Sequence, residues 1–197
     1  LTLWLVPSAS DSARLKRFMG TRPNSQSTSV SEASYPQFHP HVTLASLPDP
    51  EPPQAAILAS IPDTLRALSI SFDRVQVGDH YFRSVYLAVH PTQDLLDLHH
   101  HVHAALGIAP RTPKYPHLSL CYINDDDAAA GERTRYFDEL QNAGKIRAND
   151  EGASVSLNCG DVSDDDWLSG FQSPEIWITR CGGPVETWTV ESKIVLA

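Results

Sequence analysis

The sequence predicts an α+β fold with mostly antiparallel sheets. Three observations indicate this class. Short runs with apolar or alternating character recur along the chain, a few segments with helical periodicity lie among them, and the two kinds do not alternate strictly as in a parallel α/β protein. The chain has 197 residues, of which 41% are hydrophobic, so it can bury one sizeable core. We expect residues 1–197 to form a single domain.

The first residues predict a strand, a helix and a loop. Residues 1–7 (LTLWLVP) are apolar and end at a proline, as expected of a buried strand. Ser10 or Asp11 can cap a helix whose apolar residues recur three and four apart, and Gly20 can end it. Residues 21–37 carry many Ser, Asn and Pro without periodicity, which indicates a loop.

The next segment predicts three strands and a short helix. Residues 41–47 (HVTLASL) alternate as a strand does, and a short helix is expected over residues 55–61. Residues 68–78 and 81–90 have the composition of strands. A turn-like Gly-Asp pair at residues 78–79 separates them, so we expect two antiparallel neighbours.

The rest of the chain predicts two helices and four strands. Helical spacing of apolar residues indicates helices over residues 92–107 and 124–144, with a strand over residues 117–123 between them. The Asp triplets at residues 125–127 and 164–166 are each expected at the N-terminus of a helix, where the helix dipole favours negative charge. Three final strands, separated by turns rich in Gly, Asp and Ser, are expected over residues 153–159, 175–181 and 186–196.

A Pro-His-apolar-hydroxyl-Leu pattern occurs twice, as PHVTL and PHLSL. Because side chains alternate along a strand, His41 and Thr43 share one face, and so do His117 and Ser119. Each pair then holds an imidazole and a hydroxyl about 7 Å apart, which suits two oxygens of one phosphate. One copy would be weak evidence, since a strand histidine beside threonine usually makes only a structural hydrogen bond. Two copies, each following a proline-marked loop, indicate a shared function.

Two imidazoles suit the opening of a phosphodiester. One neutral ring can accept a proton from water while the other, protonated, gives a proton to the departing oxygen. The hydroxyls can donate to nonbridging phosphate oxygens. We therefore predict His41 and His117 as catalytic residues and Thr43 and Ser119 as substrate-binding residues. This scheme requires no metal and no cofactor.

The motifs HVT and HLS resemble the two H-x-[ST] signatures of the 2H phosphoesterase superfamily. With WLVP, FHPHVTLAS, YFRSVYL and PHLSLCY, the chain looks most like the plant and fungal 2′,3′-cyclic nucleotide phosphodiesterase branch of that superfamily. The resemblance covers nearly the whole chain, although only the two histidine motifs are specific. It implies a single domain of two lobes, in which two mostly antiparallel sheets face a central cleft and helices lie on the outer faces.

The resemblance also implies an activity. Members of this branch hydrolyse a ribose 2′,3′-cyclic phosphate to the 2′-phosphate, and they convert ADP-ribose 1″,2″-cyclic phosphate, a by-product of tRNA splicing, to ADP-ribose 1″-phosphate. We expect His117 to act as the base and His41 as the acid for the 3′ oxygen, and the opposite assignment stays open. The physiological substrate, whether a cyclic mononucleotide, the ADP-ribose derivative or an RNA end, stays open as well.

Four further residues are candidates for the site. By the same resemblance, Trp4 and Tyr122 contact the nucleotide base or sugar. Core packing explains both aromatic residues equally well, and strand parity turns Tyr122 away from the histidine motif unless the strand bends or ends before it. Ser84 and Arg83 are also expected to border the cleft.

Charge and cysteine content limit the partners and the compartment. A net charge of −9, with no polybasic run, disfavours a long nucleic acid, so a small cyclic phosphate nucleotide is the expected partner. No run approaches the roughly 20 apolar residues of a membrane span. We expect an intracellular, cytoplasmic monomer, with endomembrane association left open. Cys121, Cys159 and Cys181 lack paired spacing, so we expect structural thiols, although one disulfide stays possible.

Other histidines offer an alternative. His99 and His103 lie at i and i+4 of a predicted helix, which is metal-ligand spacing, but no third ligand accompanies them and a solvated helix face is favoured. His39 could join His41 and His117 at a zinc ion, which is a minority interpretation. The alternatives to a cyclic phosphodiesterase are therefore a zinc-dependent phosphohydrolase and a noncatalytic nucleotide-binding module.

Overall fold

The computed structural model describes residues 1–23, 30–112, 114–149, 152–160 and 164–197. Within these ranges, no helix has both the length and the apolar character needed to cross a bilayer. The helices and strands are, in chain order, β1 (Thr2–Val6), α1 (Ala9–Met19), β2 (Val42–Ser46), α2 (Gln54–Ala59), β3 (Leu68–His80), β4 (Arg83–Val89), α3 (Gln93–Leu106), β5 (His117–Cys121), α4 (Asp125–Ala129), α5 (Glu132–Asn142), β6 (Ile146–Asn149), β7 (Ser154–Asn158), β8 (Trp167–Leu168), β9 (Gly170–Ser173), β10 (Glu175–Arg180), the 3-10 helix η2 (Val185–Thr187) and β11 (Thr189–Val195).

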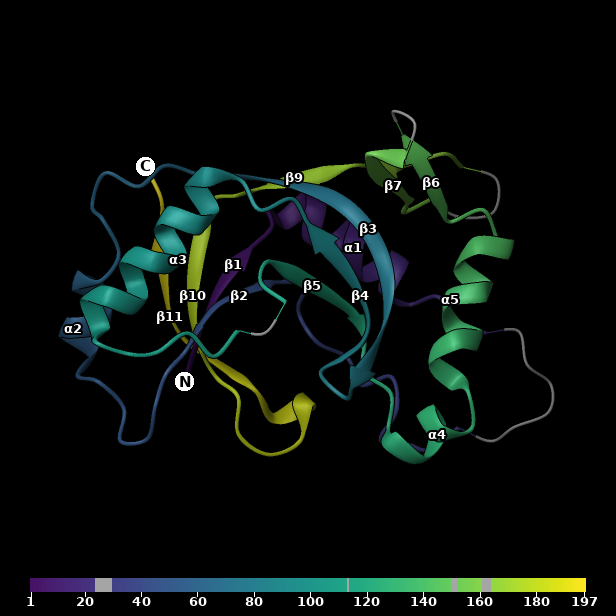
Figure 1. Ribbon diagram of the computed structural model, residues 1–197, viewed down its shortest axis with the longest axis horizontal. Helices are drawn as coiled ribbons and strands as arrows, with labels where there is room; N and C mark the ends of the chain where they lie inside the picture. Colours follow the sequence, from purple (N-terminus) through teal and green to yellow (C-terminus); the bar gives the residue numbers. More distant parts are fainter. Residues whose placement is uncertain (24–29, 113, 150–151, 161–163) are drawn as a thin grey trace.

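Two antiparallel sheets form the framework. The main sheet has the strand order β11-β10-β1-β2-β5-β4-β3-β9, and β6, β7 and β8 form a smaller sheet. The predicted α+β class with antiparallel sheets is confirmed. Figure 1 shows α2 and α3 at one side of the molecule and α4 and α5 at the opposite side; α3 contacts β2, and α5 contacts β3 and β4. The main sheet thus lies between two groups of helices.

The main sheet contains a weakly paired junction at its centre. Strands β2 and β5 are joined at one residue pair, Val42 with Leu118, whereas β1 and β10 pair along the full length of β1. The strands on either side of this junction therefore belong to one sheet. The two histidine motifs lie on the two strands that meet there.

The core lies on the face of β2 and β5 opposite to the histidines. Val42, Leu44 and Leu118 are fully buried, and Leu120 is nearly so. These residues belong to one continuous core that also includes the apolar sides of α1, α3 and α5. Because side chains alternate along a strand, burial of the apolar set directs the polar members of both motifs to the other face.

Two of the predicted boundaries were wrong. Helix α1 begins at Ala9 and is capped by Ser8, whose hydroxyl accepts a hydrogen bond from the Asp11 amide at 3.2 Å, rather than by Ser10 or Asp11. The turn between β3 and β4 does not lie at residues 78–79, because β3 continues to His80. Gly78 instead lies at a shift in the register between β3 and β4. A Cβ atom there would overlap a carbonyl oxygen of β4. The glycine allows a close backbone approach rather than a turn.

The segment predicted as one helix over residues 124–144 forms two helices. Gly131, with φ of 90°, separates α4 from α5 in a conformation that favours glycine. The Asp triplet at residues 125–127 occupies the first turn of α4, as predicted. The triplet at residues 164–166 was wrongly assigned to a helix, because strand β8 follows it. Asp166 forms ion pairs with Arg14 and Arg17 of α1 and so ties that helix to the small sheet.

Candidate active site

The register of β2 and β5 explains why the motif is repeated. The apolar residues at the centres of the two motifs lie opposite each other in an antiparallel pair. Antiparallel pairing about this point places His41 opposite Ser119 and Thr43 opposite His117. The two motifs are therefore related by a local two-fold axis, and each imidazole neighbours the hydroxyl of the other strand. The four side chains face one surface of the sheet, with the two rings on a diagonal.

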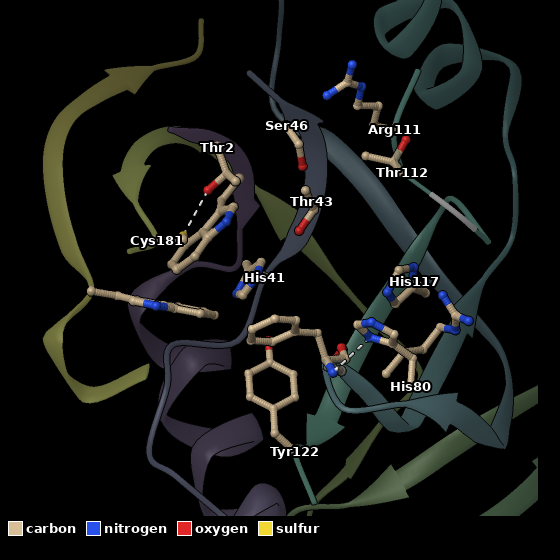
Figure 2. A pocket seen from close by; sticks show the side chains of 15 residues that line it. Thr2, His41, Thr43, Ser46, His80, Arg111, Thr112, His117, Tyr122 and Cys181 are labelled. Atoms are coloured by element: carbon tan, nitrogen blue, oxygen red, sulfur yellow. Dashed lines mark hydrogen bonds between the residues drawn. The ribbon is translucent and has the colours of Figure 1, made fainter. Parts of the chain in front are cut away.

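All four motif residues line one cavity of about 390 Å³. Figure 2 shows His41 and His117 projecting into this cavity from neighbouring strands. Aromatic side chains that lie close to one another line part of it, and basic side chains also contribute. The aromatic residues are Trp4, Phe82, Tyr122 and Trp188, and the basic residues other than the motif histidines are His80, Arg83 and Arg111.

His41 is held in one tautomer by the backbone before β2. Its Nδ1 atom lies 2.6 Å from the carbonyl oxygen of His39. A carbonyl oxygen only accepts, so Nδ1 carries the proton and the lone pair is on Nε2. The ring is 7% exposed and stacks on Trp4, with centroids 3.7 Å apart and planes inclined by 10°. The indole therefore fixes the plane of the imidazole, and the hydrogen bond fixes its rotation.

His117 is held in the same tautomer by the backbone before β5. Its Nδ1 atom donates to the carbonyl oxygen of Lys114 at 3.2 Å, which again leaves the lone pair on Nε2. The edge of the ring contacts Tyr86, with centroids 5.5 Å apart. Each of the two loops that precede the motifs thus supplies a backbone carbonyl that accepts a hydrogen bond from Nδ1. This hydrogen bond directs Nε2 into the cavity.

Burial keeps both rings neutral in the free protein. Burial, with smaller contributions from the nearby rings of His39 and His117, lowers the pKa of His41 to about 3. Burial also lowers the pKa of His117 to about 4, with a smaller contribution from the positive charge of Arg83. Hydrogen bonds to the backbone carbonyls oppose both shifts. At neutral pH each ring can therefore accept a proton, and an anionic ligand is needed before either ring readily holds one.

The hydroxyls of Thr43 and Ser119 differ in their hydrogen bonding. Among the described residues, the Thr43 hydroxyl has no hydrogen-bond partner, and it borders the cavity. The Ser119 hydroxyl donates to the carbonyl oxygen of Phe82 at 2.7 Å. A hydroxyl has a single proton, so Ser119 can donate to a ligand only after it turns away from this carbonyl. The Thr43 hydroxyl can donate to a ligand without first breaking a hydrogen bond.

The two predicted aromatic residues lie in the cavity and also pack against protein. Trp4 is 3% exposed and supports His41, as described above. Tyr122 lines the cavity because β5 ends at Cys121, so strand alternation no longer governs its direction. Its ring stacks on Phe38 with centroids 4.0 Å apart.

Ser84, which we predicted to bind substrate, lies away from the cavity. Ser84 is fully buried, outside the set of cavity-lining residues. Its hydroxyl accepts from the Ile123 amide at 2.9 Å and donates to the Tyr81 carbonyl at 2.8 Å. Arg83, its neighbour, does line the cavity as expected, since adjacent residues of β4 point to opposite faces.

The other histidines do not assemble a metal site. His39 packs on Trp177 with centroids 4.4 Å apart and does not line the cavity. His103 is 3% exposed, so the prediction of a solvated face was wrong for this residue. Both His99 and His103 follow Leu95 at spacings that place them on the apolar stripe of α3. Within the described ranges, no three His, Cys, Asp or Glu side chains gather so that they could hold a metal ion.

Several cavity residues were missed by sequence reasoning. Arg111 and Thr112 lie in the loop just before the second motif, and this proximity is the signal that could have revealed them. Trp188 and Cys181 lie in the segment between β10 and β11, and no sequence pattern marks them. Cys181 is a free thiol, as are the other two cysteines, and it lies 3.1 Å from the Thr2 hydroxyl. Burial raises its pKa, consistent with the expected structural role.

Comparison with known proteins agrees with the motif analysis. The chain is 30% identical over 122 residues to a protein of Arabidopsis thaliana named cyclic phosphodiesterase. The aligned region covers 61% of this chain and 64% of that relative, so less than two thirds of the relative's length is spanned. The sequence also matches the family described as "Cyclic phosphodiesterase-like protein" over residues 1–196, which confirms the expected family. The chain therefore belongs to the cyclic phosphodiesterase-like protein family.

Proposed function

We propose that the protein hydrolyses 2′,3′-cyclic nucleotides to nucleoside 2′-phosphates without a metal ion. The observation that carries this proposal is the pair of imidazoles from His41 and His117, both with Nε2 directed into one cavity beside two hydroxyls. The names of the family and of the Arabidopsis relative refer to the same class of bond. We extend the proposal to ADP-ribose 1″,2″-cyclic phosphate, which also carries a five-membered cyclic phosphodiester on a ribose, across its 1″ and 2″ oxygens, and would give ADP-ribose 1″-phosphate.

In the proposed reaction, a water molecule attacks phosphorus in line with the bond to the 3′ oxygen. His117 Nε2 accepts a proton from this water as the new P–O bond forms. The P–O3′ bond breaks, and His41 donates the proton on its Nε2 to the 3′ oxygen, which leaves as a hydroxyl. The phosphate stays on the 2′ oxygen. One proton enters the protein from water and one leaves it with the product, so the charges balance.

The surroundings of the two rings support this assignment of base and acid. Burial and, to a smaller extent, the positive charge of Arg83 lower the pKa of His117, which favours a neutral ring and hence a base. His41 stacks on the face of Trp4, and an aromatic face stabilises a cation placed over it. Burial opposes a charge on His41 in the free protein. The negative charge of the bound phosphate offsets that cost, so His41 becomes protonated together with substrate binding.

The hydroxyls stabilise the phosphate while its geometry changes. Thr43, with no partner among the described residues, donates directly to a nonbridging oxygen. Ser119 donates to a second oxygen after exchanging its bond to the Phe82 carbonyl for one to the charged phosphate. A hydrogen bond to a charged acceptor is roughly twice as strong as one between neutral groups, which favours the exchange.

The proposal is tested by the identity of the product. Purified protein is incubated with 2′,3′-cyclic AMP, with and without a chelator, and 2′-AMP and 3′-AMP are separated by chromatography. We expect 2′-AMP at the same rate in both samples. Loss of activity with chelator, restored by zinc, would support the zinc-dependent alternative. Binding without turnover would support a noncatalytic module, and 3′-AMP would show that the acid acts on the 2′ oxygen.

A further inference from the structure

The catalytic cavity has a polar end that the hydrolytic mechanism does not use. In Figure 2, Arg111, Thr112 and Ser46 lie together at the end of the cavity away from Tyr122, with His41 and His117 between the two ends. A cavity of about 390 Å³ is large enough to enclose a whole small ligand rather than a phosphate group alone. Substrate groups beyond the cyclic phosphate therefore have space at both ends.

The guanidinium of Arg111 is an uncompensated positive charge. Among the described residues, it has neither an ion-pair nor a hydrogen-bond partner, and its side chain is exposed. The other arginine of the cavity, Arg83, is paired with Asp79 at 2.9 Å. In a protein of net charge −9, an unpaired cation at the cavity gives this end a local attraction for anions that the overall charge does not supply.

Helix α3 anchors the loop that carries Arg111. A hydrogen bond of 2.7 Å joins the Thr112 hydroxyl to His99 Nε2. Tyr115 stacks on the same histidine, with centroids 4.2 Å apart, and its hydroxyl donates to the Leu95 carbonyl at 3.0 Å. The backbone beside Arg111 is thus held at two points. Binding through Arg111 therefore does not have to order its loop, which reduces the loss of backbone freedom on binding.

We infer that Arg111, with Ser46, forms a second anion subsite that binds a phosphate other than the one being hydrolysed, while Thr112 positions the loop that carries Arg111. This inference rests on the proposed function, because it names the substrate class of the same cavity. Guanidinium and hydroxyl groups are suitable donors for phosphate oxygens, and a guanidinium can bind two of them at once. The preferred substrates are nucleoside 2′,3′-cyclic phosphates that also carry a 5′-phosphate.

The covalent structure of such a substrate fits the two ends of the cavity. In a ribose 2′,3′-cyclic phosphate, the base is attached at C1′ and the 5′ carbon at C4′, on either side of the edge that carries the phosphate. With the cyclic phosphate between His41 and His117 and the base at the aromatic end, the 5′ substituent extends toward Arg111. A 5′-phosphate in that position forms an ion pair with the guanidinium of Arg111.

The test compares two substrates that differ in one phosphate. Values of kcat/KM are measured for 2′,3′-cyclic AMP and for its 5′-phosphorylated form, with wild type, Arg111→Gln and Arg66→Gln. We expect wild type to prefer the 5′-phosphorylated substrate by about tenfold, equivalent to about 1.4 kcal/mol. Arg111→Gln should reduce this ratio to about one. Arg66→Gln, which changes an exposed arginine away from the catalytic cavity, should keep the wild-type ratio. A ratio near one in wild type, or an unchanged ratio in Arg111→Gln, would overturn the inference.

A binding measurement separates this inference from the proposed hydrolysis. Titration calorimetry gives the affinities of adenosine 5′-monophosphate and of adenosine, neither of which can be hydrolysed by this reaction. Tighter binding of the 5′-phosphate by wild type, but not by Arg111→Gln, supports the subsite even if no turnover is found. Equal affinities of the two compounds for wild type would refute it, even if 2′,3′-cyclic AMP is hydrolysed.

Discussion

The buried, neutral state of His41 predicts a defined loss of stability in acid. Burial lowers the pKa of this ring from its ordinary value of about 6.5 to about 3 in the folded protein. Between those values the unfolded chain binds a proton that the folded protein does not, so stability falls as the pH decreases through this window. From about pH 7.5 to about pH 5, this one group lowers the free energy of unfolding by about 2 kcal/mol.

The variant His41→Gln isolates that contribution. Glutamine does not titrate, and its amide can still donate to the His39 carbonyl. Urea unfolding at the two pH values gives the loss of stability for each protein, and the wild type should lose about 2 kcal/mol more than the variant. Contributions from the other histidines cancel in this comparison. His100→Gln, at an exposed position of α3, is the matched control and should behave as wild type. Equal acid losses in wild type and His41→Gln would show that the ring is not held neutral by burial.

Further predictions concern the groups around His41. Trp4→Leu removes the ring stack and should lower kcat by up to about tenfold with little change in KM, as steady-state kinetics will show. Thr43→Ala should reduce kcat/KM more than Ser119→Ala, because only the Ser119 proton is already engaged; equal effects would contradict this ranking. Ser84→Ala should lower the free energy of unfolding by about 1–3 kcal/mol and leave kcat near wild type, measured on the folded fraction. The pH profile of kcat/KM should be bell-shaped with its maximum below pH 6.5, because burial depresses the pKa of both rings in the free enzyme; a flat profile would oppose the two-ring mechanism.

The face of each motif could be predicted because strand alternation is a local property. His41 and Thr43 must share a face once their apolar neighbours are buried, whatever the rest of the fold does. The pairing of β2 with β5 could not be predicted in the same way, since it joins segments far apart in the chain. Repetition of the motif was the available signal, because two copies on antiparallel neighbours generate the four-residue site.

Other errors have equally specific causes. Strands β6, β8 and β9 were not expected, because they are short and their stability comes from partners elsewhere in the chain rather than from their own composition. His103 was assigned to solvent on the basis of residue type, although its spacing from Leu95 places it on the apolar stripe. Trp188 reaches the cavity only through tertiary folding. Periodicity therefore predicted the direction of side chains better than residue type did.

In the proposed mechanism, two imidazoles from distant parts of the chain act together on one phosphorus atom. Single-turnover hydrolysis of 2′,3′-cyclic AMP is measured for His41→Ala and His117→Ala, with His100→Ala as the control. We expect each of the first two variants to lose at least about a hundredfold in rate while the control retains the wild-type rate. A folded His41→Ala or His117→Ala protein with a rate close to wild type would contradict it.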